Sequence, residues 1–192
     1  MIIGLSQRVL NYREREYDCL SRDFYSYFNG HTLLPVPNGY DIDYDELVNK
    51  LDVFIITGGD AHPKRTQTEL IIAEKMTSLG KPIIGICYGA FLLTDTFNGT
   101  VEAKYDMPTG IEHDVIYHTY DTIESVNSFH NNVITKEPPG SIVLCSDENG
   151  YVESWVKGNV GAVVWHPERM DNPWVPEEIE SLLKEQLTYT LH

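Results

Sequence analysis

The sequence predicts an α/β fold with a mostly parallel open sheet, helices on both faces and a cysteine on a nucleophile elbow. Continuous apolar runs at 52–56 and 82–86 are typical of parallel strands that are buried on both faces. Segments with helical apolar spacing separate such runs, and this alternation favours βαβ units. No linker, repeat or low-complexity segment divides the chain, so we expect a single domain over residues 1–192.

The N-terminal quarter is predicted to begin with a β-α-β unit. An apolar strand at 1–5 is followed by a helix over 13–28, where aromatic residues recur at helical spacing and where Cys19 would lie. A strand at 32–37 completes the unit. A short helix over 43–51, with acidic residues in its first turn, then leads to the next buried strand.

The middle of the chain is predicted to be less regular. A helix over 66–79 returns the chain to the strand at 82–86. Residues 101–120 are interpreted as a polar surface connection, and residues 121–134 as strand and turn. Within the connection, Glu112, His113 and His118 superficially resemble a metal cluster. Their spacing matches no strong ligand motif, so we predict no metal there.

The C-terminal part is predicted to form a hairpin, a buried strand and a helix. Strands at 141–145 and 151–156 flank the turn signal Asp147-Glu148-Asn149-Gly150. A further apolar strand covers 160–165. The last helix starts at Pro176, and its expected buried stripe consists of Ile179, Leu182, Leu183 and Leu187.

Cys87 is the first candidate for chemistry, because it lies between Gly85 and Gly89 where an apolar strand meets a helical pattern. In a nucleophile elbow the reactive side chain is at the tip of a tight turn, and flanking glycines relieve the crowding. A position at a helix N-terminus is expected to lower the thiol pKa. Taken alone, the G-x-C-x-G pattern is equally explained by close packing.

His166 and Glu168 follow the apolar strand at 160–165 and are the second candidates. Residues two apart in an extended chain project to the same side, so Glu168 can orient the His166 ring and stabilise its imidazolium form. A histidine at a strand end is often a structural hydrogen-bonding residue. The flanked cysteine at another strand end favours the catalytic interpretation.

Four motifs in this order resemble the class I glutamine amidotransferase superfamily, whose sheet is flavodoxin-like. They are Ile56-Thr57-Gly58-Gly59-Asp60, Gly85-Ile86-Cys87-Tyr88-Gly89, Val126-Asn127-Ser128-Phe129-His130 and His166-Pro167-Glu168. The third motif resembles the V-N-S-x-H segment of the stand-alone γ-glutamyl hydrolases of the peptidase C26 type. The resemblance runs from residue 2 to about 169.

The resemblance implies a catalytic triad of Cys87, His166 and Glu168, which cleaves a γ-glutamyl amide through a glutamyl thioester without metal or cofactor. It also implies an oxyanion hole made by the backbone N–H of Tyr88 and that of Gly58 or Gly59. Residues expected to contact the substrate are Asn127, Ser128, Phe129, His130 and Arg65.

Two of these substrate contacts have a plainer alternative. His130 can equally be a structural hydrogen-bonding residue. Residues 60–65 are polar and form either an ordinary solvated loop or a substrate-facing loop, in which Lys64 or Arg65 meets an anionic group.

Phe91 departs from the family pattern, because glutaminase members usually carry there a glutamine that recognises free glutamine. We therefore expect a stand-alone hydrolase of a larger conjugate. One candidate substrate is γ-glutamyl-CDP-amidate, from phosphoramidate synthesis for capsule polysaccharide, and residues 3–8 resemble the hydrolases that cleave it. The other candidate is γ-glutamyl-GABA. The alternative is a glutaminase subunit that delivers ammonia to a separate synthase. A third hypothesis, a catalytically silent binding module, is opposed by the intact triad.

Composition limits the partners and the compartment. The chain has 14 basic and 29 acidic residues, and a net charge of −15 repels nucleic acids and anionic membranes. An odd number of cysteines (Cys19, Cys87 and Cys145) without a signal peptide indicates a reduced, cytoplasmic setting. No apolar run reaches transmembrane length. Besides a small γ-glutamyl substrate, the partners considered are a second copy of the chain and a synthase.

Overall fold

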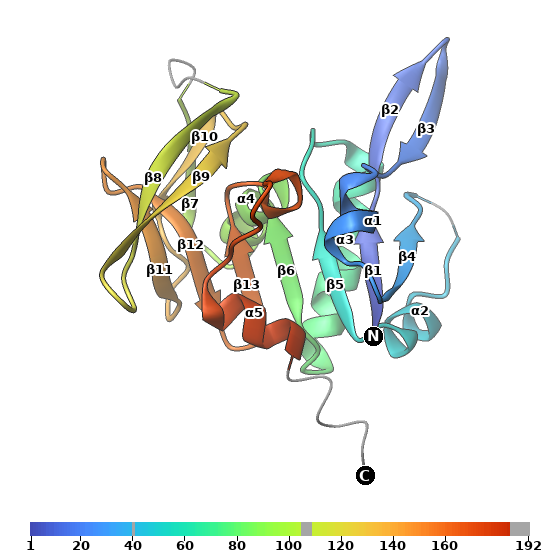
Figure 1. The fold of residues 1–192 in the computed structure, drawn as a ribbon. Helices are drawn as coiled ribbons and strands as arrows, with labels where there is room; N and C mark the ends of the chain where they lie inside the picture. Colours follow the sequence, from blue (N-terminus) through green and yellow to red (C-terminus); the bar gives the residue numbers. More distant parts are fainter. Residues whose placement is uncertain (40, 105–108, 185–192) are drawn as a thin grey trace.

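The computed structural model describes residues 1–39, 41–104 and 109–184, and within them an 11-stranded mixed sheet flanked by helices (Figure 1). The sheet follows the order β4-β1-β5-β6-β13-β12-β11-β8-β9; outside this path, β10 pairs with β12, and β7 pairs with β10. Its centre is parallel, which confirms the predicted α/β class. The parallel strands are β1 (Ile2–Ser6), β4 (Thr32–Val36), β5 (Val53–Ile56), β6 (Ile83–Ile86) and β13 (Val160–Val163).

An antiparallel half extends this sheet beyond β13. Its strands are β7 (Thr100–Ala103), β8 (Ile111–Tyr117), β9 (Thr122–Ser128), β10 (Asn132–Lys136), β11 (Ile142–Asp147) and β12 (Val152–Lys157). The antiparallel pair β11–β12 confirms the predicted hairpin over 141–156, and Cys145 is in its first strand. The prediction that residues 101–120 form a polar connection is wrong. Residues 111–117 pair in register with β9, and their alternating exposed and buried side chains are typical of a sheet with one solvated face.

The helices cover both faces of the parallel centre. They are α1 (Asp23–Tyr27), α2 (Tyr44–Lys50), α3 (Pro63–Ser78), α4 (Tyr88–Thr96) and α5 (Glu177–Lys184), with a 3₁₀ turn η1 (Pro167–Arg169). Gly85 of β6 is in contact with α4, whereas Gly161 of β13, which is in register with Ile84, is in contact with α5. Since neighbouring residues of a strand face opposite sides, α4 and α5 lie on opposite faces.

Several predicted elements are confirmed with small shifts in their ends. The helix predicted over 66–79 begins earlier, at Pro63, because proline is well suited to the first helical position. In α5, Ile179 and Leu182 are buried and Leu183 packs against the core, as the predicted stripe requires. Leu187 lies outside the described residues. Among the described helices, none is long and apolar enough to cross a membrane.

The helix predicted over 13–28 is wrong for its first half. Residues 8–19 form a separate hairpin of β2 (Arg8–Tyr12) and β3 (Arg15–Cys19), which projects from the carboxyl end of β1 (Figure 1). Arg13 and Glu14 close it with φ of 48° and 61°, as a two-residue hairpin turn requires. Such turns usually contain glycine or asparagine, and that signal is missing here. Cys19 is therefore in a strand, and only α1 remains helical.

The five parallel strands end at one edge of the sheet, and sequence motifs follow three of these ends. The segment 57–60 follows β5, Cys87 follows β6, and His166 comes shortly after β13. In open α/β sheets, ligands bind in a crevice outside the carboxyl ends of the strands. The topology therefore brings the predicted site residues to one edge.

Gly89 tests the packing of α4 on this sheet. A Cβ at Gly89 would lie 2.1 Å from the carbonyl oxygen of Ile56, a backbone atom of β5. We expect Gly89→Ala to lower the free energy of unfolding by about 3 kcal/mol, at the upper end of overpacking costs. Helix propensity alone would instead raise the free energy of unfolding, because alanine is favoured over glycine in a helix.

The matched control is Gly140→Ala, at a glycine with φ of 78° and no heavy atom within 4 Å of a built Cβ. It should cost only about 1 kcal/mol, from the left-handed backbone. Urea unfolding of both variants gives the two values. Equal losses would contradict the close contact between α4 and β5.

Candidate active site

Cys87 is held in an unusual backbone conformation between β6 and α4. Its φ and ψ are 52° and −106°, a backbone conformation that residues other than glycine rarely adopt. The Cys87 N–H donates to the carbonyl of Val163 in β13 at 2.9 Å, and Phe91 N–H donates to the Cys87 carbonyl at 3.1 Å. A Cβ at Gly85 would lie 2.4 Å from the Gly89 carbonyl oxygen. The glycines on both sides of Cys87 are therefore required for the turn.

Burial dominates the electrostatics of the Cys87 thiol. It raises the pKa of Cys87 to about 12, and the negative charges of Glu168 and Glu153 act in the same direction. The Tyr88 backbone N–H and the positive charge of Arg169 oppose this effect but are weaker. The N-terminus of α4 thus lowers this pKa as expected, but burial outweighs its effect and the net shift is upward. Only 7% of the residue is exposed, which leaves the thiolate poorly solvated.

His166 and Glu168 form a buried pair. His166 Nδ1 is 2.7 Å from Glu168 Oε1, and the residues are 2% and 7% exposed. The intervening chain forms η1 instead of extended strand, but the two side chains still meet. Because a carboxylate only accepts, Nδ1–H donates to Glu168 and leaves the lone pair on Nε2.

Asn127 holds the backbone of His166 from the end of β9. Its Nδ2 donates to the His166 carbonyl at 2.8 Å, and its Oδ1 accepts from the His166 N–H at 2.9 Å. Both polar groups of the side chain are thus used on His166. The sequence suggests Asn127 only as a substrate contact. Its positioning role depends on the contact between the end of β9 and His166, which are 39 residues apart, and no local pattern indicates it.

The ends of β6 and β13 bring Cys87 and His166 to neighbouring positions. Ile86 and Val163, which precede them by one and three residues, are in register on adjacent parallel strands. The 57–60 segment completes the arrangement, because a Cβ at Gly58 would lie 2.3 Å from His166 Cε1. Gly59 has a φ of 119°, which glycine adopts without strain.

A pocket of about 720 Å³ opens in front of Cys87. Its wall includes residues from five separate segments of the chain. They are Gly59, Asp60, Ala61, Thr66, Cys87, Tyr88, Phe91, Leu92, Asp95, Val101, Thr109, Phe129, His130, Asn131 and Asn132. Asp95, Asn131 and Asn132 were not predicted as site residues, since no motif marks them and only the fold brings them together.

The predicted substrate segment divides in the structure. Phe129 and His130 line the pocket, and the His130 ring is 5.9 Å from that of Phe91. His130 Nδ1 also meets the Asn132 carbonyl oxygen at 2.8 Å, so the structural role considered for it is present as well. Ser128 is buried and lies outside the pocket wall.

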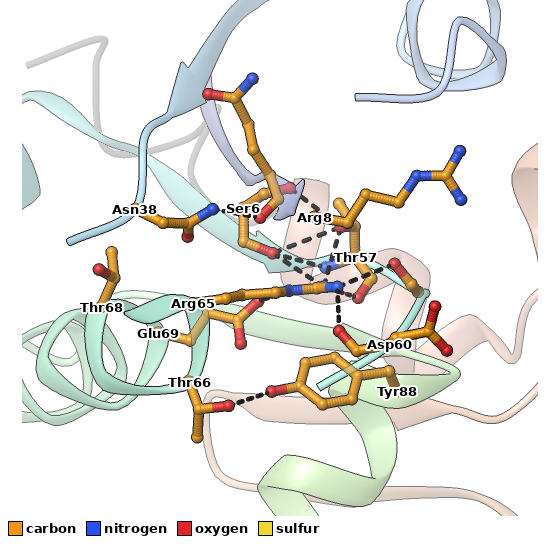
Figure 2. A network of polar contacts seen from close by, with 12 residues as sticks. Ser6, Arg8, Asn38, Thr57, Asp60, Arg65, Thr66, Thr68, Glu69 and Tyr88 are labelled. Carbon is orange, nitrogen blue, oxygen red and sulfur yellow. Dashed lines mark hydrogen bonds and ion pairs between the residues drawn. The ribbon is translucent and has the colours of Figure 1, made fainter. Parts of the chain in front are cut away.

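The expectation of an exposed polar loop at 60–65 is wrong for Arg65. Its side chain is fully buried in α3, where Nε is 2.7 Å from Glu69 Oε1 (Figure 2). The guanidinium donates to backbone carbonyls of the 57–60 segment instead of facing the pocket. Lys64 is exposed and pairs with Glu16 of β3 at 2.9 Å.

The histidines of the predicted surface connection have other partners. His113 Nε2 is 3.7 Å from Glu153 Oε2, which raises the pKa of His113, and His118 Nε2 is 3.0 Å from Ser146 Oγ. Within residues 1–39, 41–104 and 109–184, no three His, Cys, Asp or Glu side chains come together as metal ligands.

Comparison with known proteins now assigns the family. The family described as glutamine amidotransferase class-I matches residues 23–185, which include all the candidate catalytic residues. The chain belongs to this family. As a class I glutamine amidotransferase domain, it is an enzyme of the cysteine amidohydrolase type, and the resemblance seen in its motifs is confirmed at this level.

Several relatives of this glutamine amidotransferase domain are known by sequence. It is 32% identical over 102 residues to a GMP synthase [glutamine-hydrolyzing] of Pyrobaculum aerophilum, a match that covers 50% of this chain and 20% of the relative. It is 25% identical over 122 residues to anthranilate synthase component 2 of Archaeoglobus fulgidus, covering 61% and 65%. The chain thus corresponds to only part of each relative.

Solved structures agree on the fold. A glutamine amidotransferase from Thermotoga maritima superposes with a TM-score of 0.65 at 14% identity, covering 100% of this chain and 86% of the other. A Thermoplasma acidophilum protein, which is provisionally assigned to GMP synthase, gives 0.69 at 19% identity and covers 99% and 96%. These likenesses confirm the expected class I glutamine amidotransferase fold.

The raised pKa of Cys87 has a direct consequence for its reactivity. Because the thiolate fraction increases with pH below the pKa, we expect alkylation of Cys87 by iodoacetamide to accelerate about tenfold per pH unit between pH 7 and 9. Mass spectrometry of the Cys87 peptide measures the rate, and Cys87→Ala gives the background from the other thiols. A plateau below pH 8 would contradict a neutral buried thiol.

Asn127 gives a second test of the site. Asn127→Ala leaves the His166 N–H and carbonyl without their partners, so we expect a loss of about 2 kcal/mol in unfolding free energy. The control Asn11→Ala, on the exposed hairpin, should stay within about 0.5 kcal/mol of wild type. Urea unfolding measures both. An Asn127→Ala protein as stable as the control would contradict this role.

Proposed function

We propose that this chain hydrolyses a γ-glutamyl amide, with Cys87 as nucleophile, His166 as general base and acid, and Glu168 as the group that orients the imidazole. The observation that carries the proposal is the buried His166–Glu168 hydrogen bond of 2.7 Å at the end of β13, beside the strained turn that presents Cys87. This combination of residues on two adjacent strand ends has the logic of a catalytic triad.

The proposed reaction starts with a neutral thiol. As Cys87 Sγ attacks the γ-carbonyl carbon, its proton passes to His166 Nε2, and the resulting imidazolium is stabilised by Glu168. His166 then protonates the leaving nitrogen, the C–N bond breaks, and a glutamyl thioester remains on Cys87. Water, deprotonated by His166, attacks the thioester and releases glutamate and the free thiol.

The negative oxygen of each tetrahedral intermediate needs hydrogen-bond donors. The Tyr88 N–H, at the first position of α4, and the N–H of Gly58 or Gly59 are the proposed donors. Loss of one such donor typically costs about 3 to 4 kcal/mol of transition-state stabilisation. These steps use only side chains and backbone groups of this chain.

Glutamine is the substrate that the comparisons favour. One relative is named as a glutamine-hydrolysing GMP synthase and another as component 2 of anthranilate synthase. By analogy, this chain would release ammonia from glutamine for a separate synthase. This is the alternative function that the sequence indicates, and the relatives support it better than a specific conjugate hydrolase.

A larger γ-glutamyl conjugate is the second candidate, and Phe91 favours it. Phe91 lines the pocket at the position where glutaminase members usually carry glutamine, so a polar contact to free glutamine is replaced by an aromatic ring. The pocket volume of about 720 Å³ is within the range of about 300–1,000 Å³ typical of small-molecule sites, so it has room for a ligand larger than glutamine. γ-Glutamyl-CDP-amidate and γ-glutamyl-GABA remain the conjugates to test.

Glutamate release from a panel of amides tests the proposal. We expect the purified protein to release glutamate from glutamine, γ-glutamyl-GABA or γ-glutamyl-CDP-amidate, and Cys87→Ala to abolish release with unchanged circular dichroism. Release from glutamine favours the glutaminase that serves a synthase, and release from a conjugate alone favours the stand-alone hydrolase.

The matched control for this panel is Cys145→Ala, since Cys145 is in β11 and lies outside the pocket wall. It should keep wild-type activity. A Cys87→Ala protein that still releases glutamate would contradict the proposal.

A further inference from the structure

Arg65 and Glu69 form an ion pair whose side chains are both fully buried. The two residues are one turn apart on α3, and Arg65 Nε is 2.7 Å from Glu69 Oε1. Burying two charges is costly, and such a pair is weak evidence for stability alone. A buried arginine with five donors is better explained by what the remaining donors hold.

The other donors of Arg65 hold the segment that carries Gly58 and Gly59. Nη2 donates to the Thr57 carbonyl, and Nη1 donates to the carbonyls of Gly58 at 3.3 Å and Asp60 at 3.2 Å. Thr57 is also fixed to β1, because its N–H donates to Ser6 Oγ at 3.0 Å. The guanidinium thus donates hydrogen bonds to three backbone carbonyls of one short turn (Figure 2).

These contacts determine where the N–H groups of the turn point. In a planar trans peptide, the C=O of one residue and the N–H of the next point in opposite directions. With the Thr57 and Gly58 carbonyls directed at Arg65, the N–H groups of Gly58 and Gly59 are directed away from it. Gly58 lies against His166, and Gly59 lines the same pocket as Cys87.

Arg65 also contacts the second half of the proposed oxyanion hole. The Tyr88 ring packs against the guanidinium, with Arg65 Cζ 4.3 Å from the ring centroid, and its hydroxyl is 2.8 Å from Thr66 Oγ1. Figure 2 shows the guanidinium between the 57–60 segment and this ring. Two neighbouring residues of α3 therefore fix the side chain of the residue that contributes the other N–H donor.

We propose that Arg65 is a positioning residue that sets both halves of the oxyanion hole, the turn at Gly58–Gly59 through its carbonyls and Tyr88 through its ring. This inference rests on the proposed function, since an oxyanion hole matters only if a tetrahedral intermediate forms. Glu69 fixes the plane of the guanidinium. Arg65 itself contacts no substrate.

Arg65→Lys is the main test, because lysine keeps the charge beside Glu69 but cannot bridge three carbonyls and a ring. With γ-glutamyl-p-nitroanilide, we expect kcat to fall about 10²-fold, as for the loss of one oxyanion donor, and KM to stay close to wild type. Alkylation of Cys87 by iodoacetamide should also stay close to wild type, because displacement of iodide at a saturated carbon develops no oxyanion. A merely structural defect would lower both rates together.

The matched control is Lys75→Gln. Lys75 is on the same helix as Arg65 but away from the 57–60 segment, and the substitution breaks its ion pair of 2.6 Å with Asp45 of α2. It should behave as wild type. If Arg65→Lys does not fold, Thr66→Val removes the partner of the Tyr88 hydroxyl. Because Thr66 also lines the pocket, the expected result is a smaller loss of kcat with unchanged KM and unchanged alkylation. Wild-type kcat in Arg65→Lys, or in Thr66→Val where that is the variant measured, would overturn the inference.

Hydrogen exchange separates this inference from the proposed function. Backbone amides of residues 57–61 should exchange faster in Arg65→Lys than in wild type or Lys75→Gln, whether or not the probe is hydrolysed. Absence of hydrolysis by wild type, with this faster exchange, would count against the proposed function and leave Arg65 as the residue that holds the turn. Unchanged exchange would overturn the role of Arg65.

Discussion

The site depends on how closely α4 crosses the parallel strands at Gly85 and Gly89. At both glycines a Cβ would meet backbone atoms within 2.4 Å, so the helix can start directly after β6 only because these side chains are absent. The resulting turn holds Cys87 with a positive φ, a conformation that costs of order 1–3 kcal/mol and persists where the surroundings enforce it. Here the buried β6 and α4 supply that enforcement.

Burial acts differently on Cys87 and on His166, the two partners in the proposed proton transfer. It raises the pKa of the Cys87 thiol to about 12, so the thiol is neutral near pH 7. The same burial strengthens the hydrogen bond that orients His166, since a low local dielectric increases electrostatic interactions. Thiolate formation is therefore coupled to proton transfer onto His166. The position of Cys87 at the start of α4 contributes less to this balance than desolvation does.

The parts of the fold that follow from local sequence were predictable, and those set by long-range pairing were not. Apolar runs such as 82–86 gave the parallel strands, and the motifs at Cys87 and His166 gave the family. The hairpin at 8–19 was missed because Arg13 and Glu14 close it without the usual glycine or asparagine. The strand at 111–117 was missed because its polar exposed face hides the alternation.

The site shows the same division. His166 and Glu168 are two residues apart, so their contact could be predicted, whereas Asn127 reaches His166 across 39 residues. Arg65 was expected in a solvated loop because its neighbours are polar, yet α3 turns its side chain into the interior. Pattern reasoning indicates which residue types carry chemistry. Which side chains hold them in place depends on tertiary packing.

The most direct test of this account is a search for the covalent intermediate. Wild-type protein mixed with a hydrolysable γ-glutamyl amide is quenched in acid within one turnover, and the peptide that contains Cys87 is analysed by mass spectrometry. The account predicts a glutamyl adduct on Cys87 that disappears as glutamate is released. Turnover without an adduct at Cys87, or with an adduct on another residue, would contradict it.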